Sequence, residues 1–287
     1  MRLGVVGMLP GALDEITPAH LDAIQALQLT GAGTHVAGAR MHTVTPESCR
    51  RVRQLFADKE MDLVQLGVGY GQCLFDPDAA VRDEVVAQIE QGIDVAHALG
   101  AHATLIRTGS LSPRGSYSPT RANHEPICRQ RLLDALGRVA AKADAVGQTV
   151  VIETHVLTIM NSPAINAEIV AEIGSPRLGV VMDYVNHFQA LYQVYDSAAR
   201  LNHIFDVMGA ISPVGHCKDI SVRDGFVTHF DEEIPGEGEL DLATALRRWH
   251  EMHPDGYMLL EHLPVEKFPL ASQNTHRILR EANIPVH

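Results

Sequence analysis

Several features that would place this chain of 287 residues in a special class are missing from it. No apolar run approaches the ~20 residues of a membrane-spanning helix, so we expect no membrane association. The four cysteines form no C-x-x-C pair, which is typical of reduced thiols in a chain of this size. The amino-terminal MRLGVVGMLPGALDE favours a first strand over a signal peptide. These absences together predict a cytoplasmic protein.

A basic surface is missing as well. The formal net charge is −12, which repels phosphate backbones, and no group of basic residues compensates it. The densest group, Arg129, Arg131 and Arg138, falls on an expected solvated helix. We therefore expect no nucleic-acid partner. No G-x-G-x-x-G follows the first strand, which argues against a dinucleotide fold, and no linker or composition break indicates a second domain.

What the chain does contain is a regular alternation of short β-rich runs and helical patterns. Apolar residues recur at near four-residue spacing in the helical segments, as in Val85, Ile89 and Ile93. Eight strands, each followed by a helix, predict an α/β fold, a single (β/α)8 TIM barrel, with a doubly wound open sheet as the alternative. The expected strands are 3–8, 33–37, 62–67, 103–108, 149–153, 178–183, 214–218 and 257–261.

Local signals mark the ends of several helices. Thr45 and Ser162 each precede a proline and are expected to cap a helix start, while Gly100 and Gly147 are expected to end helices. The longest irregular segment, 109–125, follows the fourth strand and is long enough to close over a site.

Polar residues stand at the ends of the last four predicted strands. They are Glu153, Asp183, His216 and Glu261. A carboxylate after a buried apolar run is costly unless a metal, a proton or a partner compensates it. Because side chains alternate along a strand, each of the four shares its inward direction with the apolar residue two positions earlier. In a barrel the carboxyl ends of the strands meet, so we expect the four side chains to converge.

Three carboxylates and one imidazole form a plausible ligand set for one divalent metal ion. An oxygen-rich set favours a hard or borderline ion, so we expect Mn²⁺ first, with Mg²⁺, Co²⁺ or Zn²⁺ as alternatives. Such an ion acts as a Lewis acid and orients a carbonyl and its neighbouring hydroxyl.

At these positions the chain resembles the xylose isomerase-like TIM barrels, the sugar phosphate isomerase/epimerase superfamily. The matching segments are I-E-T-H at 152–155, D-Y-V-N at 183–186, H-C-K-D at 216–219, P-G-E-G-E-L-D at 235–241 and L-L-E-H at 259–262. The resemblance spans residues 1–287 and implies one domain of this type. It also implies that Glu153, Asp183, His216 and Glu261 bind the metal.

Two departures from this family are visible. Many relatives have a histidine three residues after the aspartate, where this chain has Asn186, with His187 one position further on. The DNA-repair branch needs additional metal-binding histidines that strands three and four do not supply, and His229 alone does not replace them. The endonuclease function is therefore disfavoured.

The resemblance implies that Glu153 and Glu261 also transfer protons on opposite faces of a substrate. We expect an isomerase or epimerase that acts on a ketose or related carbohydrate through an enediolate. A lyase or dehydratase, including elimination from a 3-keto-glycoside, is the alternative, and a catalytically silent binding subunit is the third interpretation. The expected partner is a small-molecule carbohydrate, and a homo-oligomer is left open.

Further residues are candidates for roles around this site. His155 shares the direction of Glu153 and is a candidate acid or base. The candidates for substrate binding are Arg107, Lys218 and Arg223. Tyr117 in the 109–125 segment is a candidate lid residue, with packing as the alternative. The glycines at 236 and 238 suit a phosphate cradle or, alternatively, a turn into a helix that begins near Glu239.

Overall fold

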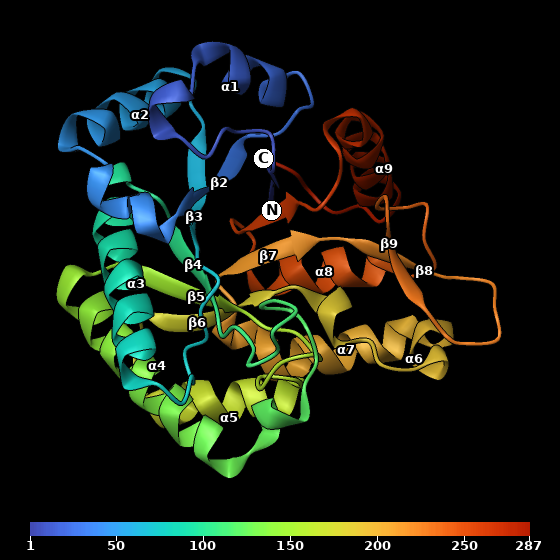
Figure 1. Cartoon of the computed structure of the whole chain (residues 1–287). Helices are drawn as coiled ribbons and strands as arrows, with labels where there is room; N and C mark the ends of the chain where they lie inside the picture. Colours follow the sequence, from blue (N-terminus) through green and yellow to red (C-terminus); the bar gives the residue numbers. More distant parts are fainter.

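The computed structural model describes Met1–His287, and eight of its strands close into a parallel barrel (Figure 1). The order around the barrel is β1-β10-β7-β6-β5-β4-β3-β2. The predicted (β/α)8 barrel is confirmed, and the open-sheet alternative is excluded. The barrel strands are β1 (Arg2–Val6), β2 (Gly31–Ala37), β3 (Asp62–Gly69), β4 (Ala103–Arg107), β5 (Thr149–Glu153), β6 (Leu178–Met182), β7 (Val214–Cys217) and β10 (Tyr257–Leu260).

All eight predicted strands are present, but five of them, β1, β4, β6, β7 and β10, end one or two residues earlier than expected. Asp183, Lys218 and Glu261 were expected inside strands, whereas β6, β7 and β10 stop one residue before them. The ladder pairs of β6 and β7 end at Met182 and Cys217, and the chain then turns away from the barrel wall. The side chains that follow are therefore presented at the mouth of the barrel and not along its wall.

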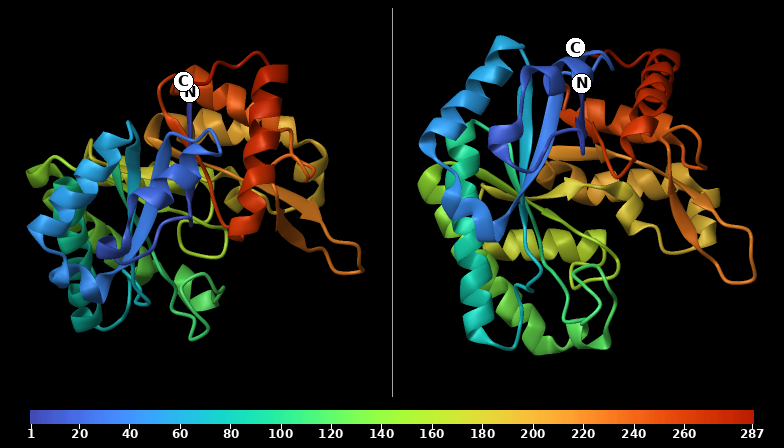
Figure 2. Two further views of the ribbon diagram at one scale, coloured as in Figure 1. Left: turned by 90° about the horizontal axis from the view of Figure 1, so that it is seen from above. Right: turned by 45° about the horizontal axis from the view of Figure 1, so that its top comes forward.

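The helices form an outer ring around the barrel (Figure 2). Thr45 and Ser162 cap α2 and α5 by accepting backbone N–H groups, as expected. Gly100 and Gly147 end α3 and α4 with φ of 73° and 78°, a left-handed conformation that glycine adopts without a Cβ clash. The helices are α1 (Pro18–Gln25), α2 (Pro46–Asp58), α3 (Ala79–Leu99), α4 (Pro126–Val146), α5 (Pro163–Ile173), α6 (Leu191–Tyr195), α7 (Ser197–Met208), α8 (Leu242–Met252) and α9 (Phe268–Glu281).

Two apolar cores lie on the two sides of the barrel wall. A large cluster fills the space between strands and helices, and a smaller one fills the barrel interior. The interior cluster includes Val151, Val181, Val214 and Leu259, the residues two positions before the four predicted ligands. This confirms the predicted inward direction and places each predicted ligand one layer above a packed apolar residue.

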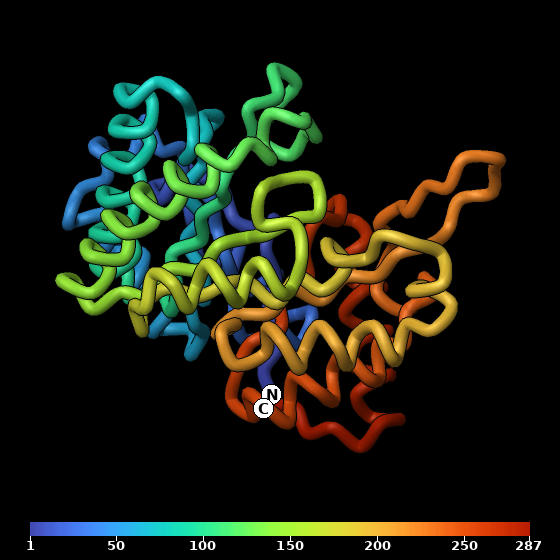
Figure 3. Tube along the Cα trace, turned by 90° about the horizontal axis from the view of Figure 1, so that it is seen from below, coloured from blue at the N-terminus to red at the C-terminus, as the bar shows by residue number.

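An antiparallel hairpin that the sequence did not predict extends from the barrel mouth. It consists of β8 (Asp219–Val222) and β9 (Phe230–Glu233), and it projects beyond the ring of helices (Figure 3). The helix after it begins at Leu242 and not near Glu239. The two chain ends meet on the far side, where the His287 N–H donates to the carbonyl of Met1 at 3.1 Å. None of the helices combines the length and apolar character of a transmembrane segment.

Candidate metal centre

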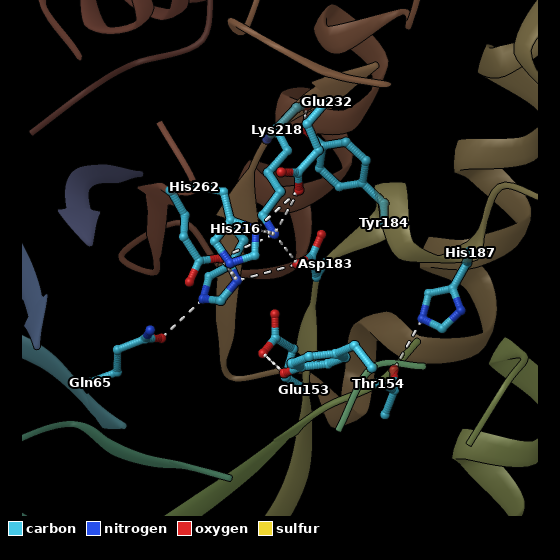
Figure 4. Close-up of polar contacts among 12 residues, drawn as sticks. Gln65, Glu153, Thr154, Asp183, Tyr184, His187, His216, Lys218, Glu232 and His262 are labelled. Carbon is cyan, nitrogen blue, oxygen red and sulfur yellow. Dashed lines mark hydrogen bonds and ion pairs between the residues drawn. The ribbon is translucent and has the colours of Figure 1, made fainter. Parts of the chain in front are cut away.

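The four predicted ligands, called the quartet below, come together at the mouth of the barrel (Figure 4). They come from four consecutive strand ends, β5, β6, β7 and β10, and one donor atom from each lies within 4.8 Å of all the others. Three of the side chains are buried and the fourth, Glu153, is half-buried at the outer edge. The quartet is therefore accessible from one side, and the carboxylate of Glu153 lies on that side.

His216 is oriented by a residue from the opposite wall of the barrel. Its Nε2–H donates to Oε1 of Gln65 on β3 at 3.1 Å, which directs Nδ1 toward the carboxylates. That nitrogen lies 2.7 Å from Glu261 Oε2 and 3.5 Å from Asp183 Oδ2. Because a proton on Nε2 leaves the Nδ1 lone pair available in neutral histidine, this contact selects the tautomer that a metal ligand needs.

Lys218 is the nearest cation to the quartet. It follows β7, two residues after His216, and its side chain is only 2% exposed. The Nζ atom lies 2.7 Å from Asp183 Oδ2 and 3.2 Å from Glu261 Oε2. The structure thus places Lys218, a candidate for substrate binding, in the centre and in contact with two carboxylate oxygens of the quartet.

The charges of these groups shift one another's pKa values strongly. Burial alone would lower the pKa of His216, but the carboxylates of Glu261 and Asp183 outweigh it and raise that pKa to about 10. Burial opposes ionisation of Asp183, yet the ammonium of Lys218 and the imidazole of His216 lower its pKa to about 2. The raised pKa of His216 reflects the carboxylates around it, and the lowered pKa of Asp183 reflects the cations around it, so the buried charges of the centre stabilise one another.

The donor set fits a divalent cation by two tests. Both Asp183 carboxylate oxygens, Glu261 Oε2 and His216 Nδ1 are buried and lack a well-aligned hydrogen bond, despite their short separations. Buried polar atoms without hydrogen-bond partners are typical of a site that holds an ion. In addition, three carboxylates against the Lys218 ammonium leave a surplus of two negative charges once His216 is neutral, as a metal ligand must be, and the imidazolium that its raised pKa favours offsets only one of them. A divalent ion offsets both.

Glu153 has a different environment from the other three ligands. Its Oε2 accepts a hydrogen bond of 2.5 Å from the hydroxyl of Tyr117, which comes from the 109–125 segment. The guanidinium of Arg107 lies 4.9 Å from the ring centroid of Tyr70 and 5.9 Å from that of Tyr117. His155 packs edge-on against the same Tyr117 ring, with centroids 6.1 Å apart. Tyr117 therefore covers the open side, and Arg107 and His155 support it.

Two residues considered from the sequence make their contacts elsewhere. Arg223 lies just beyond β8 and forms a two-pronged ion pair with Asp231 on the exposed hairpin. His187 is fully buried, and its Nε2 lies 3.1 Å from the Thr154 hydroxyl, away from the quartet (Figure 4). The histidine one position after Asn186 is thus not a fifth member of the quartet.

The fold and this geometry agree with the comparison to known families. A profile described as xylose isomerase-like TIM barrel matches residues 21–282. The chain belongs to this family. No curated protein matches the sequence.

Solved structures of this barrel type overlay the whole chain at low sequence identity. They include 3-keto-D-glucoside 4-epimerase from E. coli (TM-score 0.69, 15% identity, 98% of this chain and 99% of that one). A xylose isomerase-like TIM barrel protein from Mycobacterium smegmatis in complex with magnesium has a TM-score of 0.72 and 13% identity, over 98% and 96% of the chains. Endonuclease IV from Thermus thermophilus has a TM-score of 0.70 and 17% identity, over 98% and 100%. At these identities the overlays show the shared fold.

Three residues of the centre were not proposed from the sequence. Gln65 was a detectable candidate, because it is an amide within the apolar run of β3. Glu232 and His262 line the rim, where Glu232 Oε1 lies 3.1 Å from His262 Nδ1 and 3.4 Å from Lys218 Nζ. Glu232 had no such signal, because it reaches the rim only through the unpredicted hairpin. His262 directly follows Glu261 at a φ of 57°, a strained conformation for a residue with a Cβ.

Proposed function

We propose that this member of the xylose isomerase-like family is a divalent-metal-dependent isomerase or epimerase that acts on a ketose or related carbohydrate. The proposal rests on one observation, the convergence of four donor atoms at the barrel mouth with one carboxylate, Glu153, at the open edge. Mn²⁺ is the first candidate ion, with Mg²⁺, Co²⁺ and Zn²⁺ as alternatives. When bound, such an ion supplies Lewis-acid polarisation of a carbonyl and its adjacent hydroxyl.

The chain's own residues then transfer the protons, contact the substrate and exclude water. Glu153 removes the proton between the two substrate oxygens, because its only side-chain partner is the Tyr117 hydroxyl, which a substrate displaces. Glu261 returns a proton on the other face or at the adjacent carbon, which gives an epimer or an isomer. Lys218 and Arg107 face substrate oxygens, His155 assists proton transfer and Tyr117 excludes water. Arg223 is retained as a more remote substrate contact from the hairpin.

The same geometry also serves an elimination. Removal of the proton next to a ketone, followed by loss of a group from the β carbon, would make the protein a lyase or a dehydratase. The likeness to a 3-keto-D-glucoside 4-epimerase keeps 3-keto-glycosides among the substrates to test. Proton removal by Glu153 is common to all of these outcomes, so it is the step to measure.

The experiment incubates metal-loaded protein in D2O with free ketoses and then with 3-keto-glycosides. Deuterium at the carbon next to the carbonyl, without loss of the substrate skeleton, supports epimerisation or isomerisation. Release of an aglycone or of water selects elimination. Bound metal with no exchange on any substrate contradicts the enzymatic proposal and favours a silent binding subunit.

The matched variant is Glu153→Gln. We expect it to fold normally and to lose at least about 100-fold in exchange rate, because an amide cannot accept the substrate proton. The control is Glu172→Gln on the outer helix α5, where the carboxylate pairs only with Arg129 on the surface. Wild-type exchange by Glu153→Gln would refute the role given to Glu153.

A further inference from the structure

The position of Lys218 has a consequence for metal binding itself. Its ammonium contacts Asp183 Oδ2 at 2.7 Å and Glu261 Oε2 at 3.2 Å. These are the same two oxygens that face Nδ1 of His216. An ion held by the quartet and the ammonium in this position therefore draw on the same oxygen atoms.

Two cations at such close range repel each other in a buried setting. At an effective dielectric of about 20, charges about 4 Å apart interact by several kcal/mol. Conversely, two buried carboxylates left with no cation are also costly, because nothing replaces their lost hydration. The carboxylates therefore need a positive charge beside them whenever the metal ion is absent. When the ion is bound, that charge has to move away from it.

A second set of partners for this ammonium is within reach. Glu232 Oε1 lies 3.4 Å from Lys218 Nζ, on the side of the rim formed by β9 and the end of β10. His262 Nδ1 lies 3.2 Å from the same ammonium and 3.1 Å from Glu232 Oε1, so it accepts from Lys218 only when it does not donate to Glu232. The side chain of Glu232 is 43% exposed, so the ammonium gains a carboxylate partner and water there at once. A small rotation of the flexible lysine side chain suffices for the transfer.

We propose that Lys218 is a resident counter-cation that neutralises Asp183 and Glu261 in the metal-free site, weakens metal binding, and shifts to Glu232 when the ion enters. This inference rests on the proposed metal site and adds to it the residue that sets the affinity. Metal uptake is then an exchange of one cation for another. This exchange leaves Asp183 and Glu261 with a cationic partner both before and after the ion binds.

The first test measures Mn²⁺ binding by isothermal titration calorimetry, together with thermal unfolding with and without Mn²⁺. In Lys218→Met, which keeps an unbranched side chain but removes the ammonium, we expect Mn²⁺ affinity to rise at least about tenfold. We also expect a lower Tm without metal and a larger Tm increase on adding it. Lys59→Met, which removes a lysine paired with Asp22 on the outer surface, is the control and should match the wild type.

The second variant tests the shift itself and does not depend on the folding of the first. Glu232→Gln removes the alternative carboxylate for the ammonium, so we expect Mn²⁺ binding to weaken about threefold or more. In the double variant with Lys218→Met this loss should disappear. Unchanged binding in Glu232→Gln overturns the proposed shift, and should Lys218→Met not fold, this variant alone decides.

The failures of the two proposals are distinguishable. If neither the wild type nor Lys218→Met binds Mn²⁺, the metal site itself is wrong. If the wild type binds Mn²⁺ and Lys218→Met binds it equally or more weakly, the metal site stands and the counter-cation role is overturned.

Discussion

Two buried histidines near the mouth of the barrel have opposite environments. His216 faces two carboxylates, whereas His187 faces the hydroxyl of Thr154 and turns away from the quartet. We therefore expect His216→Ala to lower Mn²⁺ affinity by at least about 100-fold, because it removes one of four ligands. His187→Ala should change the affinity by less than about threefold. Calorimetric titration of both variants, each checked for folding by circular dichroism, measures this difference.

Equal losses in the two variants would mean that the segment after β6 supplies a fifth ligand. The sequence alone left this point open, because Asn186 occupies the position of the family histidine and His187 follows it directly. The direction of each side chain here depends on the 3-10 turn at Tyr184–His187, which β-strand alternation does not describe. By contrast, Glu153, Asp183, His216 and Glu261 could be predicted, because each stands at the end of a strand with a fixed alternation.

At the scale of elements, the loop between β9 and α8 is organised around one carboxylate. Asp219 Oδ2 accepts the N–H groups of Gly236 and Gly238 at 3.0 Å and 3.1 Å, and its Oδ1 accepts those of Ile220 and Leu240. The glycine-rich segment therefore forms an anion cradle, but the anion is a side chain of the protein. Of the two interpretations suggested by the sequence, the turn into a helix is the one that this arrangement favours.

This cradle gives a stability prediction. Asp219→Asn places an amide N–H₂ against backbone donors on one side, so we expect a loss of about 2–4 kcal/mol in unfolding free energy. The measurement is urea denaturation followed by fluorescence of the single tryptophan. The control, Asp231→Asn, removes an ion pair whose side chains are 61% and 40% exposed, and it should cost less than about 1 kcal/mol. Comparable losses in both variants would contradict the importance of the cradle.

The hairpin next to this loop shows the limit of sequence patterns for single elements. The β9 sequence, Phe-Asp-Glu-Glu, lacks apolar alternation and is an unfavourable strand by composition. It becomes a strand because Asp219–Val222 offers it a free edge to pair with, as the register from Asp219↔Glu233 to Val222↔Phe230 shows. Pairing between segments is a tertiary effect, so neither segment reveals it alone.

At the scale of the whole molecule, the barrel could be predicted because its signals repeat. Eight apolar runs separated by amphipathic helices leave few arrangements that bury both faces of a parallel sheet. The apolar runs alone also fit an open sheet, since it buries the same faces, so the prediction of closure depended on the number of strands and the length of the chain. The observed pairing of β1 with β10 closes the barrel, and the pairing of β10 with β7 places Glu261 beside the other three members of the quartet.

The stability of the whole fold should depend on pH through His187. Its pKa is lowered from the ordinary 6.5 to about 3, chiefly by burial; Asp183 opposes this shift, and Arg200 and His155 add to it. Between these two values the unfolded chain binds a proton that the folded chain excludes. The stability from keeping His187 neutral is therefore fully present above pH 6.5 and is lost as the pH falls toward 3. The slope from this one group is at most about 1.4 kcal/mol per pH unit.

Replacing His187 with glutamine keeps a polar side chain near Thr154 but removes the titrating group. We expect His187→Gln to be less stable at pH 7 and to lose less stability than the wild type as the pH is lowered through this window. Unfolding free energies from urea titrations across the window give both slopes, and His203→Gln on the exposed face of α7 controls for the loss of a histidine. Parallel slopes for His187→Gln and the wild type would show that the acid sensitivity of the barrel arises elsewhere. The buried carboxylates at its mouth are then the groups to examine, because their ion pairs with Lys218 are also broken by acid.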